Sequence, residues 1–444
     1  MDYKFNNLHN GGNIMTSPLD KFYKKSINER IESLMSAGFI EHEHISNFKQ
    51  SFSLPEGVSN HMVENVVGTY QLPLGLGMNF LINSKDYLVP MATEEPSVIA
   101  AASFGAKTVR AGGGFTTTQE KRWMIGQVIL KNVEDPEAMK EKVLAHYDDL
   151  VERAHAAHPS IVKRGGGVKD IDVRIIESNP EEHTPEFFVV HLYVDTKEAM
   201  GANIVNTMAE AIKDALEIIT GGTALMGILS NYATEALVTA SFRLDPSLLS
   251  RSGLEGTEVR DRIVEASQIA SVDPYRAVTH NKGIMNGVEA AVLATGNDTR
   301  ATSAGIHAYA SQSGQYRSLS KYYVDEHGYL VGTLTIPLAI GTVGGSISIH
   351  PGAQFTQHIL GDPDAKTLAG IVCAVGLAQN FSALRALVTD GIQRGHMALQ
   401  AKSLAMTAGA VGVEIDVISR KLRRSQPMNL TQAEALLEEY RNQS

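Results

Sequence analysis

Cysteine is scarce in this sequence, and its scarcity limits how the 444 residues can be held together. The single cysteine, Cys373, excludes an intramolecular disulfide and agrees with a reducing, cytoplasmic setting. It lies in the apolar run 369–377, where a buried thiol is favoured over a catalytic one because no histidine is adjacent. The 15 histidines show no His-x-x-x-His spacing, so we expect no metal site.

Positive charge and uninterrupted apolar runs are also limited. Lysine and arginine number 39 against 49 acids, a net charge of -10, which disfavours nucleic-acid binding. The uncharged, largely apolar run 367–384 contains Gln379, Asn380 and Ser382, which favours a buried helix over a membrane span. Residues 1–15 have no apolar signal segment; we interpret them as a disordered leader, with Met1 or Met15 as the start.

Several common catalytic signatures are missing. The glycines of 75–80 do not complete a Gly-x-Gly-x-x-Gly motif, so a Rossmann site is not supported. No Gly-x-Ser-x-Gly elbow or P-loop occurs, which argues against a serine hydrolase or a nucleoside triphosphatase. The small-residue segment 194–203 suits a pyrophosphate at a helix N-terminus or is an ordinary capped helix start. Loop 341–346 lets a ligand approach the backbone or makes a tight turn.

The middle of the chain has the pattern of a separate domain. Its expected elements run strand, helix, strand, strand, helix, strand: 126–130, 135–158, 170–176, 187–194, 201–219 and 223–229. That order is the ferredoxin-like βαββαβ arrangement. We therefore predict an α+β protein with a small ferredoxin-like domain at 121–230. It is inserted in a large, helix-rich domain, 16–120 and 231–390, and a helical C-terminal flap follows at 391–444.

Helices are expected on both sides of this insertion. Thr93 is the expected N-cap of a helix that continues through 100–103, with acids in its first turn. The run 367–388 is apolar all round and therefore central. A charged linker, 420–426, separates two helices of the flap. The remaining expected helices are 20–37, 259–269, 393–410 and 430–441.

Polar residues suited to carbonyl chemistry are concentrated in 273–298. Lys282, Arg276 and Asp298 lie there with two amides, among glycines that we expect to permit sharp turns. A fixed cation stabilises negative charge that develops on an oxygen. The alternative is a surface Lys–Asp pair on a Gly-rich loop. His396, on the expected flap, is either a structural histidine or a proton donor carried by a mobile segment.

Four blocks occur in one order: 64–69, 90–95, 273–298 and 341–345. Together with 199–203 and His396 they resemble the hydroxymethylglutaryl-coenzyme A (HMG-CoA) reductase family, and its class II, soluble prokaryotic branch in particular. The resemblance implies reduction of HMG-CoA to mevalonate and CoA with two NAD(P)H, or the reverse reaction. It also implies that the ferredoxin-like domain 121–230 binds the dinucleotide and that the large domain, 16–120 and 231–390, binds the substrate and CoA. Active sites would lie between the subunits of a homodimer or a larger assembly of dimers.

The resemblance also implies roles for individual residues. Lys282, kept cationic by Asp298, would stabilise the oxyanion, Glu95 would protonate the carbonyl oxygen, and His396 would protonate the departing CoA thiolate. Substrate contacts would be Arg276, Ser97, Asn231, Asn286 and Asn380, with Glu64 and Asn65 in the CoA region. Cofactor contacts would be Glu198, Met200, Gly201, Ala202 and Asn203, with Gly341, Thr342, Val343 and Gly344. From the residues alone, Asn231 and Asn380 could equally be structural amides.

Coenzyme choice rests on charge. Basic residues follow Glu152 with no acid among them: Arg153, His155, His158, Lys163 and Arg164. Cations suit the phosphate of NADP, whereas NAD preference needs an acid on the ribose, so we expect NADPH, with NADH as the alternative. The competing functions are another CoA-thioester oxidoreductase that stops at the aldehyde, and a non-catalytic CoA-binding protein.

Overall fold

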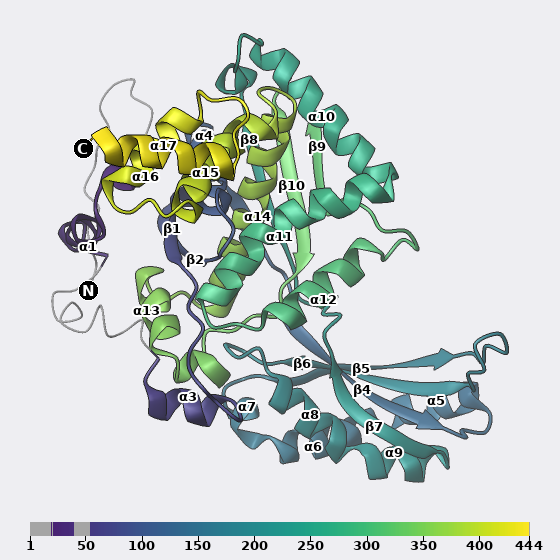
Figure 1. Cartoon of the computed structure of the whole chain (residues 1–444). Coiled ribbons are helices and arrows are strands. Elements are labelled where there is room, and N and C mark those ends of the chain that lie inside the picture. Colours follow the sequence, from purple (N-terminus) through teal and green to yellow (C-terminus); the bar gives the residue numbers. More distant parts are fainter. Residues whose placement is uncertain (1–18, 20, 40–53, 444) are drawn as a thin grey trace.

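The computed structural model describes residues 19, 21–39 and 54–443, with the backbone alone over 392–399. Residues 1–18, which contain the predicted leader, lie outside this part. Two bodies built on separate sheets are visible in Figure 1, one above the other, with the C-terminal helices packed against the upper one. The α+β class predicted from the sequence is confirmed.

The lower body contains one four-stranded antiparallel sheet in the order β5-β6-β4-β7. Its helices lie on one face of the sheet (Figure 1). Numbered along the chain, this order is 2-3-1-4, which confirms the predicted ferredoxin-like strand arrangement. The elements are β4 (Trp123–Lys131), α5 (Pro136–Ala145), α6 (Tyr147–Ala157), α7 (Pro159–Lys163), β5 (Gly167–Ile176), β6 (Phe187–Asp195), α8 (Ala202–Ala211), α9 (Lys213–Thr220) and β7 (Thr223–Ser230).

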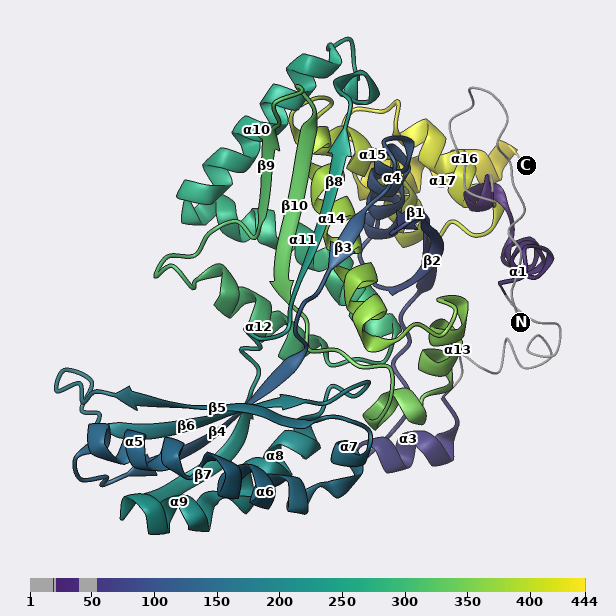
Figure 2. The same ribbon diagram turned by 180° about the vertical axis from the view of Figure 1, so that it is seen from behind.

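The upper body combines a hairpin, β1-β2, with a second sheet in the order β3-β8-β10-β9. Helices α11 and α14 lie behind this second sheet in Figure 2. Before the lower body the chain forms α1 (Ile27–Ser36), α3 (Glu56–Met62), β1 (Leu74–Ile82), β2 (Lys85–Ala92), α4 (Val98–Ala111) and β3 (Thr116–Thr118). Of these, α3 lies beside α7 of the lower body in Figures 1 and 2. After the lower body the chain forms β8 (Leu237–Leu244), α10 (Gly256–Val272), α11 (Pro274–Ala294), α12 (Thr299–Ala310), β9 (Ser320–Val324), β10 (Leu330–Pro337), α13 (Pro351–Ile359) and α14 (Ala365–Leu387).

Helix α14 is the centre of the upper body. Asp364 caps it by accepting a hydrogen bond from the Thr367 N–H at 2.7 Å. Within the described ranges it alone is long and apolar enough to cross a membrane, but 89% of its apolar window is buried inside the protein. The predicted buried helix is therefore confirmed. Cys373 is buried on it, and burial raises the pKa of its thiol, so the inert interpretation of this cysteine holds.

The segment 273–294 is a helix, not the series of turns that its glycines suggested. Asp273 accepts hydrogen bonds from the Tyr275 and Arg276 N–H groups, and Pro274 occupies the first helical position. Both features favour a helix start. Gly287 lets α14 approach, because a Cβ there would lie 3.1 Å from the Val375 carbonyl oxygen. Tertiary packing therefore outweighs the low helix propensity of glycine.

Other sequence-based boundaries need smaller corrections. Thr93 is not an N-cap, because α4 begins at Val98, after Ser97. The expected long helix 135–158 is divided at His146, although Asp135 caps it as its sequence suggests. The expected helix 20–37 contains a 3₁₀ turn followed by α1. The C-terminal region has three helices instead of two and a linker: α15 (Ile392–Thr407), α16 (Val413–Leu422) and α17 (Leu430–Gln443).

Candidate active site

A cleft of about 1660 Å³ contains several of the predicted site residues. Glu95 and Ser97 line it from the segment between β2 and α4, and Asp298 lines it from the start of α12. The segment after α3 borders the same cleft through Val66 and Thr69. Chain segments that are distant in the sequence therefore converge on one large cavity.

The first feature of this site is an ion pair at its edge. Lys282 Nζ donates to Glu95 Oε2 at 2.7 Å, and Asn286 Nδ2 donates to Glu95 Oε1 at 3.4 Å. Lys282 and Asn286 stand four positions apart on α11, so their side chains share one face of the helix. The Lys282 and Glu95 side chains retain 58% and 38% of their exposure. A ligand in the cleft can therefore reach both.

Asp298 does not take the place expected for it. Its carboxylate accepts hydrogen bonds from the Arg300 and Ala301 N–H groups at 2.9 and 3.0 Å, as the N-cap of α12. Its ion pair is a long one, 3.8 Å, with Arg300. In the part of the chain that the structure describes, Lys282 pairs with Glu95. The expected Lys282–Asp298 contact is therefore replaced by a Lys282–Glu95 contact in this structure.

Ser97 has two unusual properties. Its backbone lies in the left-handed region, at φ 76°, which costs a residue with a side chain about 1 kcal/mol or more. Its hydroxyl oxygen is buried without a hydrogen-bond partner among the described residues, although the residue lines the cleft. Strain and an unsatisfied buried hydroxyl at one position are both typical of a ligand site.

Asn380 belongs to a buried network and not to the cleft surface. Its Oδ1 accepts from the Ser320 hydroxyl at 2.9 Å and from the Tyr322 hydroxyl at 2.8 Å, and its amide nitrogen lies 3.2 Å from His280 Nε2. The residue is 2% exposed. Since its acceptor already has two donors, these contacts support the structural-amide alternative, and the substrate contact of Asn380 stays a prediction.

Arg276 and His280 lie one turn apart on α11. Burial, and secondarily the charge of Arg276, lower the pKa of His280 to about 3, so this histidine is neutral near pH 7. Burial also lowers the pKa of Arg276. Among the described residues Arg276 forms no ion pair with a carboxylate, which leaves this cation available to an anionic ligand.

Gln379 was not selected from the sequence. Its Oε1 is buried without a partner among the described residues, and its Cβ packs against Gly287, next to Asn286. The sequence signal for Gln379 was an amide within an otherwise apolar helix. Asn380 gives the same signal, so the sequence could not show which of the two amides lacks a partner.

The two segments predicted to hold the cofactor lie against each other. The Thr342 N–H donates to the Glu198 carbonyl oxygen at 2.8 Å, and the Thr342 hydroxyl donates to Glu198 Oε2 at 3.1 Å. Ala199 and Val343 form a parallel bridge. Gly201, at φ 93°, begins α8, so free N–H groups of that helix are available to an anion. This arrangement can hold a pyrophosphate.

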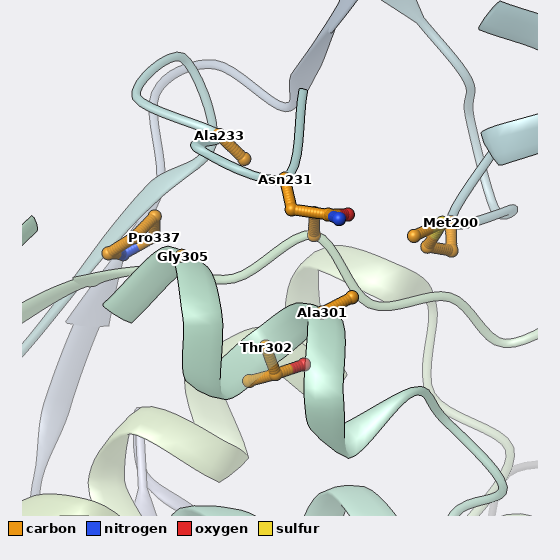
Figure 3. Close-up of a pocket in the computed structure, with 8 residues that line it drawn as sticks. Met200, Asn231, Ala233, Ala301, Thr302, Gly305 and Pro337 are labelled. Atoms are coloured by element: carbon orange, nitrogen blue, oxygen red, sulfur yellow. The ribbon is translucent and has the colours of Figure 1, made fainter. Parts of the chain in front are cut away.

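Asn231 lies at the junction of the two bodies. With Met200, Ala301 and Thr302 it lines a cavity of about 10 Å³, close to the least volume that holds one water molecule. Figure 3 shows its side chain directed toward the side of Met200. It therefore lies beside the predicted cofactor segment, to which Met200 belongs.

Three predicted residues have less definite surroundings. Glu64 and Asn65 are exposed in the segment after α3, while their neighbour Val66 lines the cleft. His396 is on α15, and its side chain lies outside the described part.

Within the described residues, no group of three or more His, Cys, Asp or Glu side chains could hold a metal ion.

A lysine–carboxylate pair beside a cleft, next to two loops suited to a pyrophosphate, defines a carbonyl-reducing oxidoreductase. Residues 26–401 match the family model for hydroxymethylglutaryl-coenzyme A reductase. The chain therefore belongs to the HMG-CoA reductase family. The family predicted from the sequence blocks is confirmed, and with it the class, an oxidoreductase that acts on HMG-CoA.

Relatives and solved structures agree. The chain is 45% identical to the 3-hydroxy-3-methylglutaryl-coenzyme A reductase of Archaeoglobus fulgidus, over 96% of each chain, and 35% identical to a probable reductase of Borreliella burgdorferi, over 86% of this chain and 85% of that one. The structure matches the Streptococcus pneumoniae reductase with TM-score 0.81 and 47% identity, covering 95% of this chain and 99% of that one. A class II structure from the same organism, bound to NADPH in open conformations, matches with TM-score 0.80 and 48% identity, covering 83% and 99%.

Proposed function

We propose that this chain reduces HMG-CoA to mevalonate and free CoA, using two NADPH in succession. The observation that carries the proposal is the Lys282–Glu95 pair at the edge of a cleft in a chain whose family model describes this reductase. A thioester requires two hydrides to become an alcohol, so each turnover contains two hydride transfers and an aldehyde between them.

Lys282 supplies the charge at the reacting oxygen. As hydride reaches the carbonyl carbon, negative charge develops on oxygen, and a fixed cation stabilises it by roughly 3–4 kcal/mol. Glu95, 2.7 Å from the ammonium group, is placed to pass a proton to the same oxygen. The Asp298 carboxylate can accept about four hydrogen bonds, and two are used by N–H groups of α12. Its remaining acceptor sites are open to other donors in the cleft.

The remaining substrate contacts are assigned by charge and by unsatisfied atoms. Arg276 binds the terminal carboxylate of the substrate, and the free hydroxyl of Ser97 and the amide of Asn286 bind its polar groups. The segment 64–69 contacts CoA, supported by the cleft-lining positions of its neighbours. His396 protonates the CoA thiolate as it leaves.

NADPH is the proposed coenzyme, supported by the NADPH in the related class II structure and by charge. His155 Nε2 already accepts the Val168 N–H, and Arg153 pairs with Asp149. Lys163 and Arg164, which are exposed at the end of α7, are therefore the cations proposed to bind the phosphate that distinguishes NADPH from NADH. When the cofactor is bound it supplies the hydride, while 198–203 and 341–344 hold and orient it.

The domain division and the assembly are part of the same proposal. Separate buried clusters in the upper body, the lower body and the C-terminal helices support the units 16–120 with 231–390, 121–230, and 391–444. Exposed apolar side chains on α10 and α11 support a homodimer: Ile269, Val272, Tyr275 and Val278. A cytoplasmic location fits the single buried thiol.

Oxidation of NADPH and NADH by the purified protein, with and without HMG-CoA, tests this function. We expect HMG-CoA-dependent oxidation that is faster with NADPH. A folded protein that binds CoA without oxidising either cofactor would instead be the non-catalytic CoA-binding protein.

A further inference from the structure

Asn297, the residue directly before Asp298, holds the loop that begins at Gly341. Its Oδ1 accepts the Gly341 N–H at 2.7 Å, and its Nδ2 donates to the Gly341 carbonyl oxygen at 3.0 Å. The asparagine side chain is buried, at 9% exposure. One side-chain amide therefore satisfies both backbone groups of a residue 44 positions away, as a neighbouring strand would do.

The amide is itself held in this orientation. Its Nδ2 lies 3.2 Å from the Thr295 hydroxyl, and the Ser346 hydroxyl donates to the Gly296 carbonyl oxygen at 2.9 Å. The turn 295–298 and the loop 341–346 are thus joined by side chains from both sides. Removal of the Asn297 amide would leave two buried backbone groups of Gly341 without partners, which is costly.

Gly341 also touches the other proposed cofactor segment. A Cβ at this position would lie 2.5 Å from the Met200 backbone nitrogen and 2.8 Å from the Glu198 carbonyl oxygen, so only glycine fits between Asn297 and that segment. The next residue, Thr342, bonds to Glu198 through its backbone and its side chain. A short series of direct contacts therefore connects Asp298 to both cofactor segments.

We propose that Asn297 is a positioning residue that sets the cofactor loops in register with the catalytic turn of Asp298. The inference rests on the proposed function, since it takes 198–203 and 341–344 as the cofactor contacts. Asn297 borders the cleft, but both ends of its side-chain amide are engaged by Gly341. It acts through Gly341, so its loss should weaken cofactor binding more than substrate binding.

Asn297→Ala removes both bonds, and the control Asn83→Ala removes the same pair of bonds at an exposed position. Asn83 makes the same two-sided contact with one residue, accepting the Thr117 N–H at 2.9 Å and donating to the Thr117 carbonyl oxygen at 3.4 Å, and it does not line the cleft. We expect Asn297→Ala to raise the dissociation constant of NADPH, measured by its fluorescence, about tenfold. The KM for HMG-CoA should change less than twofold, and Asn83→Ala should bind NADPH like the wild type.

Asn297→Asp covers the case in which the alanine variant does not fold. The aspartate keeps an acceptor for the Gly341 N–H but, when ionised, has no donor for the Gly341 carbonyl oxygen. Protonation of its carboxyl group restores that donor. The NADPH affinity of Asn297→Asp should therefore approach that of the wild type as the pH falls. Unchanged NADPH affinity in a folded Asn297 variant, or equal losses for both ligands, would overturn the positioning role.

Hydrogen exchange separates this inference from the proposed function. Without any substrate, Asn297→Ala should speed amide exchange in peptides covering 338–346 and 196–203, whereas Asn83→Ala should speed it only near 115–118. If the wild type fails to turn over HMG-CoA but exchange rises as expected, the function is wrong and the coupling stands. If turnover is normal and exchange in both loops is unchanged, the coupling is wrong.

Discussion

Lys282 and Glu95 are separated by 187 positions in the sequence, yet Lys282 Nζ lies 2.7 Å from Glu95 Oε2. The pair is too exposed to contribute much to folding, since ion pairs of this kind are worth about 0–1 kcal/mol. Its two members are the cation and the proton donor proposed for each reduction step. The relationship is therefore better explained by chemistry than by stability.

Replacing Lys282 tests that distinction. Lys282→Ala should lower kcat at least about a hundredfold, because it removes the charge that stabilises the oxyanion, while the free energy of unfolding changes by less than about 1 kcal/mol. Lys321→Ala, on the exposed surface of β9, is the control and should retain activity. A Lys282→Ala enzyme with near-normal kcat would remove the lysine from the mechanism.

Ser97→Ala should separate binding from stability. Its hydroxyl has no partner to lose in the free protein, so the variant should be as stable as the wild type, while the KM for HMG-CoA rises severalfold. Ser103→Ala is the contrast: the Ser103 hydroxyl donates to Ile99 at 2.7 Å and accepts from the Met78 N–H, so its loss should cost about 1 kcal/mol. Chemical denaturation and steady-state kinetics measure both. An unchanged KM in Ser97→Ala would show that no ligand uses the hydroxyl.

His396→Gln should slow only the thioester half of the reaction. The histidine is assigned to the CoA thiolate, which does not form when free mevaldehyde is the substrate. Reduction of mevaldehyde should therefore stay near the wild-type rate while HMG-CoA reduction falls by about a hundredfold, within the usual range for a general acid. Equal losses with both substrates would contradict this role.

His280 should make folding sensitive to acid. Burial and Arg276 hold its pKa at about 3, below the value of about 6.5 expected in the unfolded chain. As the pH falls, His280 therefore takes up a proton in the unfolded state before it does so in the folded state. The contribution of neutral His280 to the free energy of unfolding is fully present above about pH 6.5. It is lost as the pH falls toward 3, at up to roughly 1.4 kcal/mol per pH unit. Urea unfolding between pH 7 and 5 should show a shallower loss for His280→Gln. Parallel curves for both proteins would rule out this titration.

Local signals predicted much of the fold. The strand order of 121–230 and the helix start at Asp135 follow from patterns within a few residues. The helix at 273–294 was missed because Gly283 and Gly287 argue against it locally, and the packing of Gly287 on α14 outweighs that signal. Propensity is a weak prior against such tertiary contacts.

The site was predictable in composition but not in pairing. The sequence blocks indicated Lys282, Glu95 and Asp298, but the Lys282–Glu95 contact depends on the tertiary fold. Gln379 and Asn380 are neighbours on a buried helix, and helix rotation alone decides that Asn380 faces Ser320 and Tyr322. Which of two adjacent amides is bonded within the protein can therefore be decided only when the orientation of the helix is known.

The ratio of NADPH consumed to mevalonate and CoA formed tests the central claim most directly. Each product would be quantified separately in one reaction carried to completion with limiting HMG-CoA. The proposed four-electron reduction predicts two NADPH per mevalonate and one free thiol per HMG-CoA. One NADPH per thiol, with aldehyde as the product, would contradict it and identify a reductase that stops after the first hydride.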